Sequence, residues 1–566
     1  MFKFKSISKI YTYLFFMTSI FSITSSVLMF QGMKSFVYEF NLISMVSCKI
    51  SFLLYFDWLS MSFWSVVSWI SASVMLFSES YMKHDKFKSR FFSLVFLFVI
   101  SMFFLIFSLN FMSILMGWDG LGIISYILVI YYQNEYSSSA GMLTALSNRV
   151  GDAAILLSIG MMMDAGSWNF MWMTEIDSNA TYVGFLVILA SMTKSAQIPF
   201  SPWLPAAMAA PTPVSALVHS STLVTAGVYL AIRFDPYLNL LGMKKSIFLV
   251  GLITTLMSSL GATFENDLKK VIALSTLSQL GVMMSILGLG EAELAFFHLL
   301  THASFKALLF MCSGKIIHES KSTQDLRFMG ALNEGLPITS TSMNLANLAL
   351  MGFPFLAGFY SKDLFMEMFF MDSPSWVLKI SLETSLLLTS VYSVRLAFMG
   401  LLNLANQVNL SKTEDTDKSI SVSKFLLILS SITGGATMSW LFLSSPLCII
   451  LLPENKISPL LCLSAGMLFG AILSTNSPNL NYPFSMNFMF HPITGMWFIP
   501  LFQKFFSKIF LGLSGEMDMF DKSWLEKQSK MNLKHSLIAV SSQLTSAQMS
   551  MMKIFIIILP LSFLFL

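Results

Sequence analysis

About fifteen apolar stretches, each about 20 residues long, constrain this chain more than any other feature of its sequence. A stretch of that length crosses the hydrocarbon core of a bilayer as a single helix. Only 11% of the 566 residues are charged, whereas an average soluble domain is about 25% charged. The sequence therefore predicts an all-α, polytopic membrane protein of about 15–16 transmembrane helices.

Net charge, cysteine spacing and glycine spacing argue against several classes of partner and cofactor. The formal net charge of +4 is too small to indicate binding to nucleic acid. The four cysteines form no CxxC pair, so we expect neither a zinc site nor an iron–sulfur cluster. Gly288 and Gly290 are followed by Glu293 where a nicotinamide-binding fingerprint needs a third glycine.

The first 108 residues are expected to hold N-terminal helices and a surface hairpin. Three lysines precede an apolar run from Ile10 to Phe30, which is long for a signal peptide and lacks a small-residue cleavage site. We expect it to be a retained first helix. Residues 31–56 alternate between polar and apolar, which predicts a hairpin at the membrane surface. The cationic loop from Lys83 to Arg90 marks the matrix or cytoplasmic side.

The stretch from Leu189 to Leu230 places a lysine inside an apolar helix that several prolines then break. Lys194 would cost about 3 kcal/mol or more at the bilayer centre, so its position there needs a reason. A broken helix beside a charge is typical of ion transporters. His219 follows the break, and we interpret it as a proton-relay residue in preference to a satisfied core histidine.

Asp119, in the sequence GWDGLG, also lies inside an apolar run. The alternative, that it caps the start of a helix, is less favourable because Asn110 is better placed for that role. Arg149 and Asp152 are three residues apart, so they share one face of the next helix and can form a pair. That pair could hold helices together or could tune a nearby lysine.

His298, His302 and Lys306 recur at steps of four residues and therefore share one helix face. Three protonatable groups in a row predict a proton path. A zinc site is the alternative, because two histidines four residues apart can bind zinc. The residues between the histidines do not form an HExxH motif, so we favour the proton path.

A second broken helix repeats the first. Pro354 interrupts an apolar run, and Lys362 and Asp363 follow. Each broken helix is preceded by a helix with a central ionisable residue, and such correspondence is typical of inverted repeats. The two sets are Asp119 with Lys194, and Lys306 with Lys362.

The C-terminal part changes character. Residues 495–548 mix charged and apolar residues at helical spacing and predict a helix about 60–80 Å long that lies along the membrane. The remaining residues, 549–566, could anchor its end. The other expected parts are 1–108, two repeats at 109–235 and 246–402, and C-terminal transmembrane helices at 403–494.

Several motifs together resemble the subunit 5 family of mitochondrial NADH–ubiquinone oxidoreductase, respiratory complex I. They are GWDGLG, NRVGD, TKSAQIPFSPWLPAAMAAPTPVSALVHSS, HLLTHASFKALLF and GFYSKD, and they span roughly Asp57 to Arg395. Subunits of multisubunit cation/proton antiporters share these motifs. The resemblance implies two inverted five-helix bundles, a lateral helix that reaches along sister subunits, and a location in the mitochondrial inner membrane.

The resemblance also implies residue roles. It makes Asp119 and Lys194 the key carboxylate–lysine pair, Lys306 the central lysine, and Lys362 with Asp363 the exit-side pair. It places His219, His298 and His302 on a hydrated axis, and Arg149 with Asp152 near the first lysine. The family commonly has Glu where this chain has Asp119, and the shorter side chain would lengthen its contact with Lys194.

The expected function is proton translocation coupled to electron transfer from NADH to ubiquinone. The resemblance implies that NADH, FMN, the iron–sulfur clusters and ubiquinone bind to other subunits. Because a nearby carboxylate stabilises the charged form of a lysine, neutralising Asp119 would make Lys194 release its proton. One alternative is a cation/proton antiporter subunit without an electron-transfer partner. Another is a structural role with a silent channel.

Overall fold

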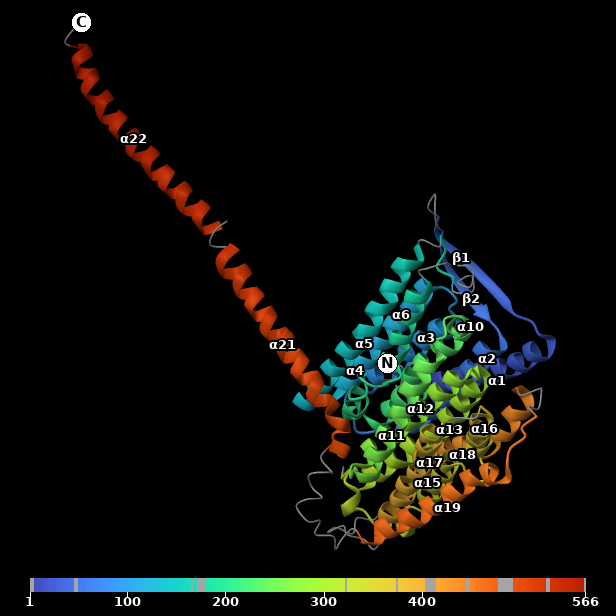
Figure 1. Ribbon diagram of the computed structural model, residues 1–566. Helices are drawn as coiled ribbons and strands as arrows, with labels where there is room; N and C mark the ends of the chain where they lie inside the picture. The colour runs from blue at the N-terminus through green and yellow to red at the C-terminus, as the bar shows by residue number, and fades with distance from the viewer. Residues whose placement is uncertain are drawn as a thin grey trace. The chain divides into compact units, whose positions relative to one another are not determined.

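The computed structural model describes residues 5–44, 49–163, 166–169, 180–320, 323–372, 375–402, 414–442, 448–476, 492–525 and 530–563. The chain divides into two compact units, Met1–Trp497 and Phe498–Leu566. The first unit is a bundle of helices with one two-stranded hairpin, and the second consists of long helices (Figure 1).

The first unit contains full-length helices, one hairpin and two places where a helix is broken. Up to the first break they are α1 (Lys5–Gly32), β1 (Phe36–Ser44), β2 (Lys49–Phe56), α2 (Trp58–Tyr81), α3 (Lys88–Phe107), α4 (Phe111–Val129), α5 (Glu135–Met162) and α6 (Ala180–Lys194). The middle of the unit holds α7 (Trp203–Ala206), α8 (Thr212–Val214), the π-helix η5 (Ser215–Thr222), α9 (Leu223–Arg233), α10 (Asp235–Leu240), α11 (Lys244–Phe264), α12 (Leu268–Leu289) and α13 (Ala292–Glu319). The unit ends with α14 (Leu332–Gly335), α15 (Pro337–Met351), α16 (Ala357–Met371), α17 (Trp376–Ala397), α18 (Lys418–Phe442) and α19 (Pro453–Asn476).

The predicted surface hairpin is confirmed. Strands β1 and β2 pair antiparallel, from Phe36 opposite Phe56 to Ser44 opposite Lys49. The backbone amide of Leu109 donates to the Leu53 carbonyl at 3.4 Å, which ties β2 to the start of α4. The hairpin directly precedes α2, and the cationic loop from Lys83 to Arg90 directly follows it. The hairpin and the loop therefore lie at opposite ends of α2.

Polar caps fix where two of the first helices begin. The Asp57 carboxylate accepts the Ser60 amide at 2.8 Å, and the Ser60 hydroxyl accepts the Asp57 amide at 3.0 Å. This capping box starts α2. Asn110 caps α4 in the same way, with Ser113 as its reciprocal partner. The prediction that Asn110 starts this helix is confirmed, so Asp119 lies well inside it.

Twelve helices in the described part of the chain are long and apolar enough to cross a membrane. The multi-pass membrane fold is confirmed, although this count is below the expected 15–16. Two physical features account for the difference. The broken helices α6, α15 and α16 contain only 15 residues each, and α5 carries many polar residues.

Helices α12 and α13 form the centre of the bundle. Almost all of α12 and the whole apolar window of α13 are buried, as is the window from Thr212 to Arg233. A helix that is apolar around its whole circumference needs neighbours on every side. Any polar side chain on these helices must therefore find its partner inside the protein.

The second unit contains α21 (Ile499–Met519), the π-helix η9 (Phe520–Leu525) and α22 (Asn532–Phe563). At 1.5 Å per residue, α22 alone is about 48 Å long. The predicted division at 549 is not a break in the helix, because α22 continues through it. No glycine or proline interrupts the chain between Asn532 and Pro560, so nothing there ends the helix.

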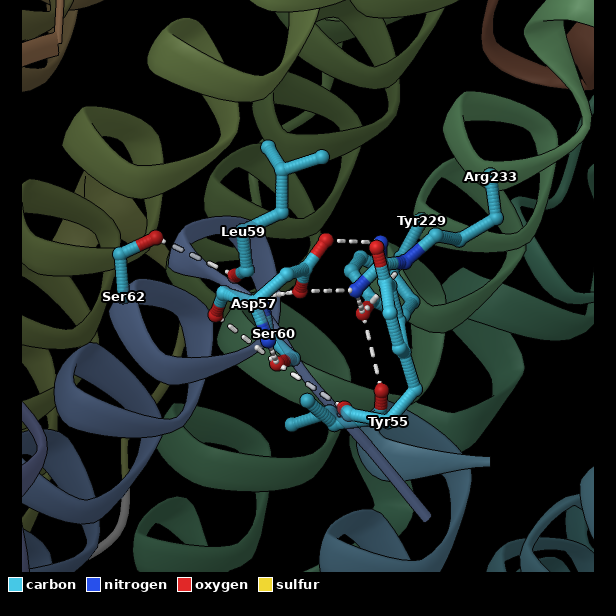
Figure 2. A network of polar contacts seen from close by, with 8 residues as sticks. Tyr55, Asp57, Leu59, Ser60, Ser62, Tyr229 and Arg233 are labelled. Carbon is cyan, nitrogen blue, oxygen red and sulfur yellow. Dashed lines mark hydrogen bonds and ion pairs between the residues drawn. The ribbon is translucent and has the colours of Figure 1, made fainter. Parts of the chain in front are cut away.

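A buried ion pair joins the start of α2 to the end of α9 (Figure 2). The Arg233 guanidinium binds Asp57 through two hydrogen bonds of 2.6 and 2.8 Å. It also donates to the Tyr229 hydroxyl, which in turn donates to the Ile106 carbonyl at 2.9 Å. Burial raises the pKa of Asp57. The charge and hydrogen bonds of Arg233, together with the hydrogen bonds of Ser60, lower this pKa by more than burial raises it, so it lies below its usual value.

Replacing Arg233 by Met is expected to destabilise the protein by about 3–5 kcal/mol, because Asp57 would remain buried without a counter-charge. The double variant Asp57→Leu/Arg233→Met removes both charges and should recover most of that loss. Thermal unfolding of the purified complex measures both effects. If Arg233→Met unfolds at the same temperature as the wild type, this ion pair does not stabilise the bundle.

Candidate functional site

The first broken helix ends on Lys194, which is fully buried. Its ammonium nitrogen donates to the Trp118 carbonyl at 2.7 Å and lies 4.0 Å from the centre of the Trp118 ring. Both contacts favour a cation at this position. Trp118 precedes Asp119 on α4, so the fold brings the predicted lysine and the predicted carboxylate to neighbouring positions.

The Asp119 carboxylate contacts Arg149 on α5. The two groups are 3.8 Å apart, and Arg149 is 3.1 Å from Asp152 one turn away. Among the ion pairs of the described residues, none joins Asp119 to Lys194. The direct contact expected from the resemblance is therefore not found within 4.0 Å among these residues, and the Asp119 carboxylate lies beside Arg149 instead.

A glycine allows close approach at each of the two breaks. A Cβ on Gly227 would lie 2.5 Å from the Ser191 carbonyl oxygen, so α9 packs directly against the last turn of α6. A Cβ on Gly358 would overlap the Ala349 carbonyl oxygen, so α16 packs in the same way against α15. Both predicted breaks are confirmed: α6 ends at Lys194, and α15 ends at Met351 before α16 begins at Ala357.

His219 lies in the π-helix η5, directly after the proline-rich segment. Its side chain is 1% exposed, and neither ring nitrogen has a hydrogen-bond partner among the described protein groups. The centre of its ring lies 6.3 Å from that of Trp203. π-Helical turns occur frequently at functional sites because they move one side chain out of the regular helical register.

The histidines and the lysine of α13 form a fully buried column. His298 contacts the Ser361 hydroxyl through Nδ1 at 2.8 Å and the side-chain amide oxygen Oε1 of Gln279 through Nε2 at 3.3 Å. The ring of His302 is centred 6.2 Å from that of His298. Both nitrogens of His302 are without a hydrogen-bond partner in the described protein. The predicted common face is therefore present.

Lys306, also 0% exposed, donates to the Ser275 hydroxyl on α12 at 2.6 Å. Because Ser275 and Gln279 are four residues apart, they present one polar face of α12 to the column on α13. The polar but uncharged character of α12 is visible in the sequence. Its register against α13 is not, so these two partners emerge only from the fold.

Lys362 begins the second turn of α16, immediately after Ser361. Its ammonium group is hydrogen-bonded to the Leu350 carbonyl at the open end of α15. Lys362 and Asp363 line a cavity of about 20 Å³, which is room for about one water molecule. The fold thus brings His298 into contact with Ser361, the residue next to Lys362, a contact that the sequence pattern did not predict.

No group of three His, Cys, Asp or Glu side chains in the described part of the chain could hold a metal ion. What the site offers is a series of buried amines and imidazoles with neutral partners. Such groups can bind a proton and pass it on, whereas metal coordination needs several converging ligands.

Three protein-family models match consecutive parts of this chain. Residues 42–92 match the N-terminal region of NADH-ubiquinone oxidoreductase (complex I) chain 5, and residues 392–566 match the C-terminus of NADH dehydrogenase subunit 5. Residues 108–389 match the transmembrane family of NADH:quinone oxidoreductase and Mrp antiporters.

Solved structures share the fold at low identity. The Mrp complex from Dietzia sp. DQ12-45-1b matches with a TM-score of 0.75 at 22% identity, covering 96% of this chain and 62% of that chain. The membrane-bound sulfane sulfur reductase, an archaeal respiratory membrane complex, matches with a TM-score of 0.72 at 19% identity. The match covers 94% of this chain and 95% of that chain.

Relatives of similar length are much closer in sequence. NADH-ubiquinone oxidoreductase chain 5 of Aedes aegypti is 47% identical over 92% of this chain and 90% of its own. NADH-ubiquinone oxidoreductase chain 5 of Anopheles gambiae is 50% identical over 82% of this chain and 80% of its own. The chain therefore belongs to the NADH-ubiquinone oxidoreductase chain 5 family, the antiporter-like, proton-translocating membrane subunits of complex I.

Proposed function

We propose that Lys194, Lys306 and Lys362 carry the protons that this subunit translocates. One observation carries the proposal: each ammonium group is buried and donates to a neutral oxygen. The acceptors are the Trp118 carbonyl, the Ser275 hydroxyl and the Leu350 carbonyl. In the described part of the chain, no carboxylate lies within 4.0 Å of any of the three. An ammonium group buried without a counter-charge is costly, which favours a group that exchanges its proton.

The histidines connect the lysines. His298 and His302 lie on the same face as Lys306, and His219 follows the break after Lys194. The free nitrogens of His219 and His302 need hydrogen-bond partners, and water is the partner that a buried relay would use. We therefore assign all three histidines to a hydrated path, with Asp363 beside Lys362 at its exit.

Asp119, Arg149 and Asp152 tune the first lysine. Arg149 lies between the two carboxylates, and its side chain is 54% exposed on this chain. A change that draws Arg149 away would release the Asp119 carboxylate toward Lys194, and the reverse change would withdraw it. Moving a charge across 100 mV costs about 2.3 kcal/mol, comparable to a pKa change of about two units.

Replacing Asp119 by Asn is expected to lower coupled proton pumping and to leave assembly intact, because Asn keeps the shape and removes the charge. Asp372→Asn, at an exposed position directly after α16, is the matched control and should pump like the wild type. Proton uptake per NADH oxidised in reconstituted vesicles measures the effect. Normal pumping in Asp119→Asn would contradict the tuning role.

The redox chemistry belongs to other subunits in this proposal. The site residues offer amines, imidazoles and carboxylates, which move protons but not electrons. We therefore assign NADH, FMN, the iron–sulfur clusters and ubiquinone to partner subunits in the mitochondrial inner membrane. Co-purification with flavin-containing and iron–sulfur subunits distinguishes this assignment from a cation/proton antiporter, which would have no such partners.

The long helices of the second unit are proposed to bridge other membrane-arm subunits. The first of them, α21, carries an exposed apolar stripe at steps of three or four residues: Phe502, Phe505, Ile509 and Leu513. Lys504 and Lys508 lie on its opposite face. An exposed apolar stripe of this length marks an interaction surface, and a membrane-arm neighbour or lipid would cover it.

A further inference from the structure

We propose that protons reach His298 from the matrix side through a hydroxyl-lined seam between α1, α2 and α18. The inference deepens the proposed function, because it supplies an inlet for the histidine–lysine column of α13. It rests on two cavities, on a row of buried hydroxyl groups between them, and on a short hydroxyl connection to His298.

The outer cavity opens at the end where α2 ends and α18 begins. Its volume is about 670 Å³, and its lining includes Ser8 and Lys9 of α1, Glu79 and Ser80 of α2, and Lys418 of α18 with Asp417 directly before it. Lys83, in the cationic loop, also lines it. The positive-inside rule assigns this loop to the matrix side. The outer cavity is therefore a charged vestibule on the side from which protons are taken up.

The inner cavity lies deeper along the same three helices and touches α13. Its volume is about 260 Å³, and it is lined by Ser19 of α1, Ser65 and Trp69 of α2, Thr433 of α18, and Thr301 and Ser304 of α13. Trp69 is the twelfth of the 24 residues of α2, so this cavity lies near the middle of the membrane. It reaches the helix that carries the proton column.

Buried hydroxyl groups connect the two cavities along α1. Ser8 lines the outer cavity, Ser19 lines the inner one, and Thr12 lies between them. All three side chains are at most 3% exposed, although α1 is otherwise a largely exposed helix. Ser8 and Ser19 are eleven residues apart, which is about 16 Å along a helix. These hydroxyl groups share one face of α1 with the buried ring of Phe15, so water between the helices has to complete the path past that ring from the vestibule to the membrane centre.

The polar part of the inner cavity's lining can hold water, although apolar side chains such as Ile20, Ile23 and Leu429 make up most of that lining. Its hydroxyl groups already donate to carbonyls of their own helices, for example Ser65 to Ser62 at 2.6 Å and Ser304 to Thr301 at 2.7 Å. Their oxygens remain free to accept. The Trp69 indole nitrogen is buried and has no acceptor among the described protein groups. A water molecule can accept from Trp69 and donate to the hydroxyl oxygens, and the cavity has room for several.

Thr301 carries the connection onward to the column. Its hydroxyl lies 3.5 Å from that of Ser361, which is 2.8 Å from Nδ1 of His298. The first distance is at the long limit for a hydrogen bond, and either hydroxyl can be its donor. Ser361 then gives its proton to His298 and receives one from the Thr301 side, so each transfer leaves the hydroxyl groups as they were. Thr301 and Ser361 are relay residues in this scheme.

The test uses the intact complex reconstituted in vesicles. Ser19→Leu fills the inner cavity, and Thr301→Val removes the hydroxyl group while keeping the side-chain shape. Both should lower the number of protons translocated per NADH oxidised, and Thr301→Ser should restore it. Thr24→Leu, at an exposed position of the same helix, is the matched control and should pump like the wild type.

A second measurement reports on the occupant of the cavity. Radiolytic labelling by activated bound water should oxidise Trp69 and Met438, which line the inner cavity, and Ser19→Leu should abolish that labelling. Wild-type pumping in both cavity variants, or an unlabelled cavity that holds a lipid chain, would overturn the inlet. If Lys306→Met abolishes pumping while the cavity variants do not, the proposed function stands and only this inlet fails.

Discussion

Replacing Lys306 by Met is expected to abolish most proton translocation while the fold remains intact. The side chain is fully buried and donates to the Ser275 hydroxyl, with His302 one turn away on the same face. Met fills a similar volume without a charge, so the packing of α12 against α13 should survive. Translocation should fall on the order of tenfold or more, which corresponds to at least about 1.4 kcal/mol in the barrier.

Lys306→Arg distinguishes a relay from a fixed charge. Guanidinium keeps its proton at any physiological pH, so a relay that needs Lys306 to release a proton should fail with Arg. Proton translocation by both variants in reconstituted vesicles is the measurement. Lys270→Met is the matched control, because it removes a half-buried lysine at the start of the neighbouring helix α12, where it pairs with Asp267 and Glu265 and not with the column. Wild-type rates with Arg would show that Lys306 acts only as a fixed charge.

The neutral hydrogen-bond partner of Lys306 also supports a role for this lysine as a proton relay. Ser275 accepts a hydrogen bond from the ammonium group while its own hydroxyl donates to the Ile272 carbonyl at 2.7 Å, and rotation of that hydroxyl would let it donate to a neutral amine instead. A carboxylate in its place would hold the proton on the lysine. The contact with Ser275 therefore suits either protonation state of Lys306, which is what a relay group requires.

Periodicity and helix-breaking residues were sufficient to predict much of the architecture. Step-of-four spacing placed His298, His302 and Lys306 on one face, and prolines located both broken helices. Period-two alternation predicted the hairpin. Each of these features depends on residues close together in the chain, and local spacing determines which side chains share a helix face or a strand face.

Contacts between distant segments could not be predicted in the same way. The ion pair of Asp57 with Arg233 joins residues 176 positions apart, and nothing near either residue indicates the other. The Asp119 carboxylate was expected beside Lys194 but lies beside Arg149, since side-chain length and helix packing together decide which cation it reaches. The π-helix around His219 was also missed, because its extra residue per turn has no clear sequence signature.

Removing residues 495–566 is expected to release distal subunits from the membrane arm. The described residues of α21 and α22 are almost all exposed on this chain, including the apolar stripe of Phe502, Phe505 and Ile509. Each such side chain buried against a neighbour contributes about 1.5–3 kcal/mol, so a row of them makes a strong attachment. The size of the complex on a native gel measures the loss.

Point substitutions separate the bridge from a general effect of truncation. Phe505→Glu with Ile509→Glu places two charges in the apolar stripe and should reproduce the loss of distal subunits, because burying unpaired carboxylates is costly. Lys504→Ala with Lys508→Ala changes the opposite face of the same helix and should leave the complex at full size. Migration of the truncated complex at full size would show that α21 and α22 do not hold the neighbouring subunits. Since the first unit contains all the proposed relay residues, its proton path should then be testable without the long helices.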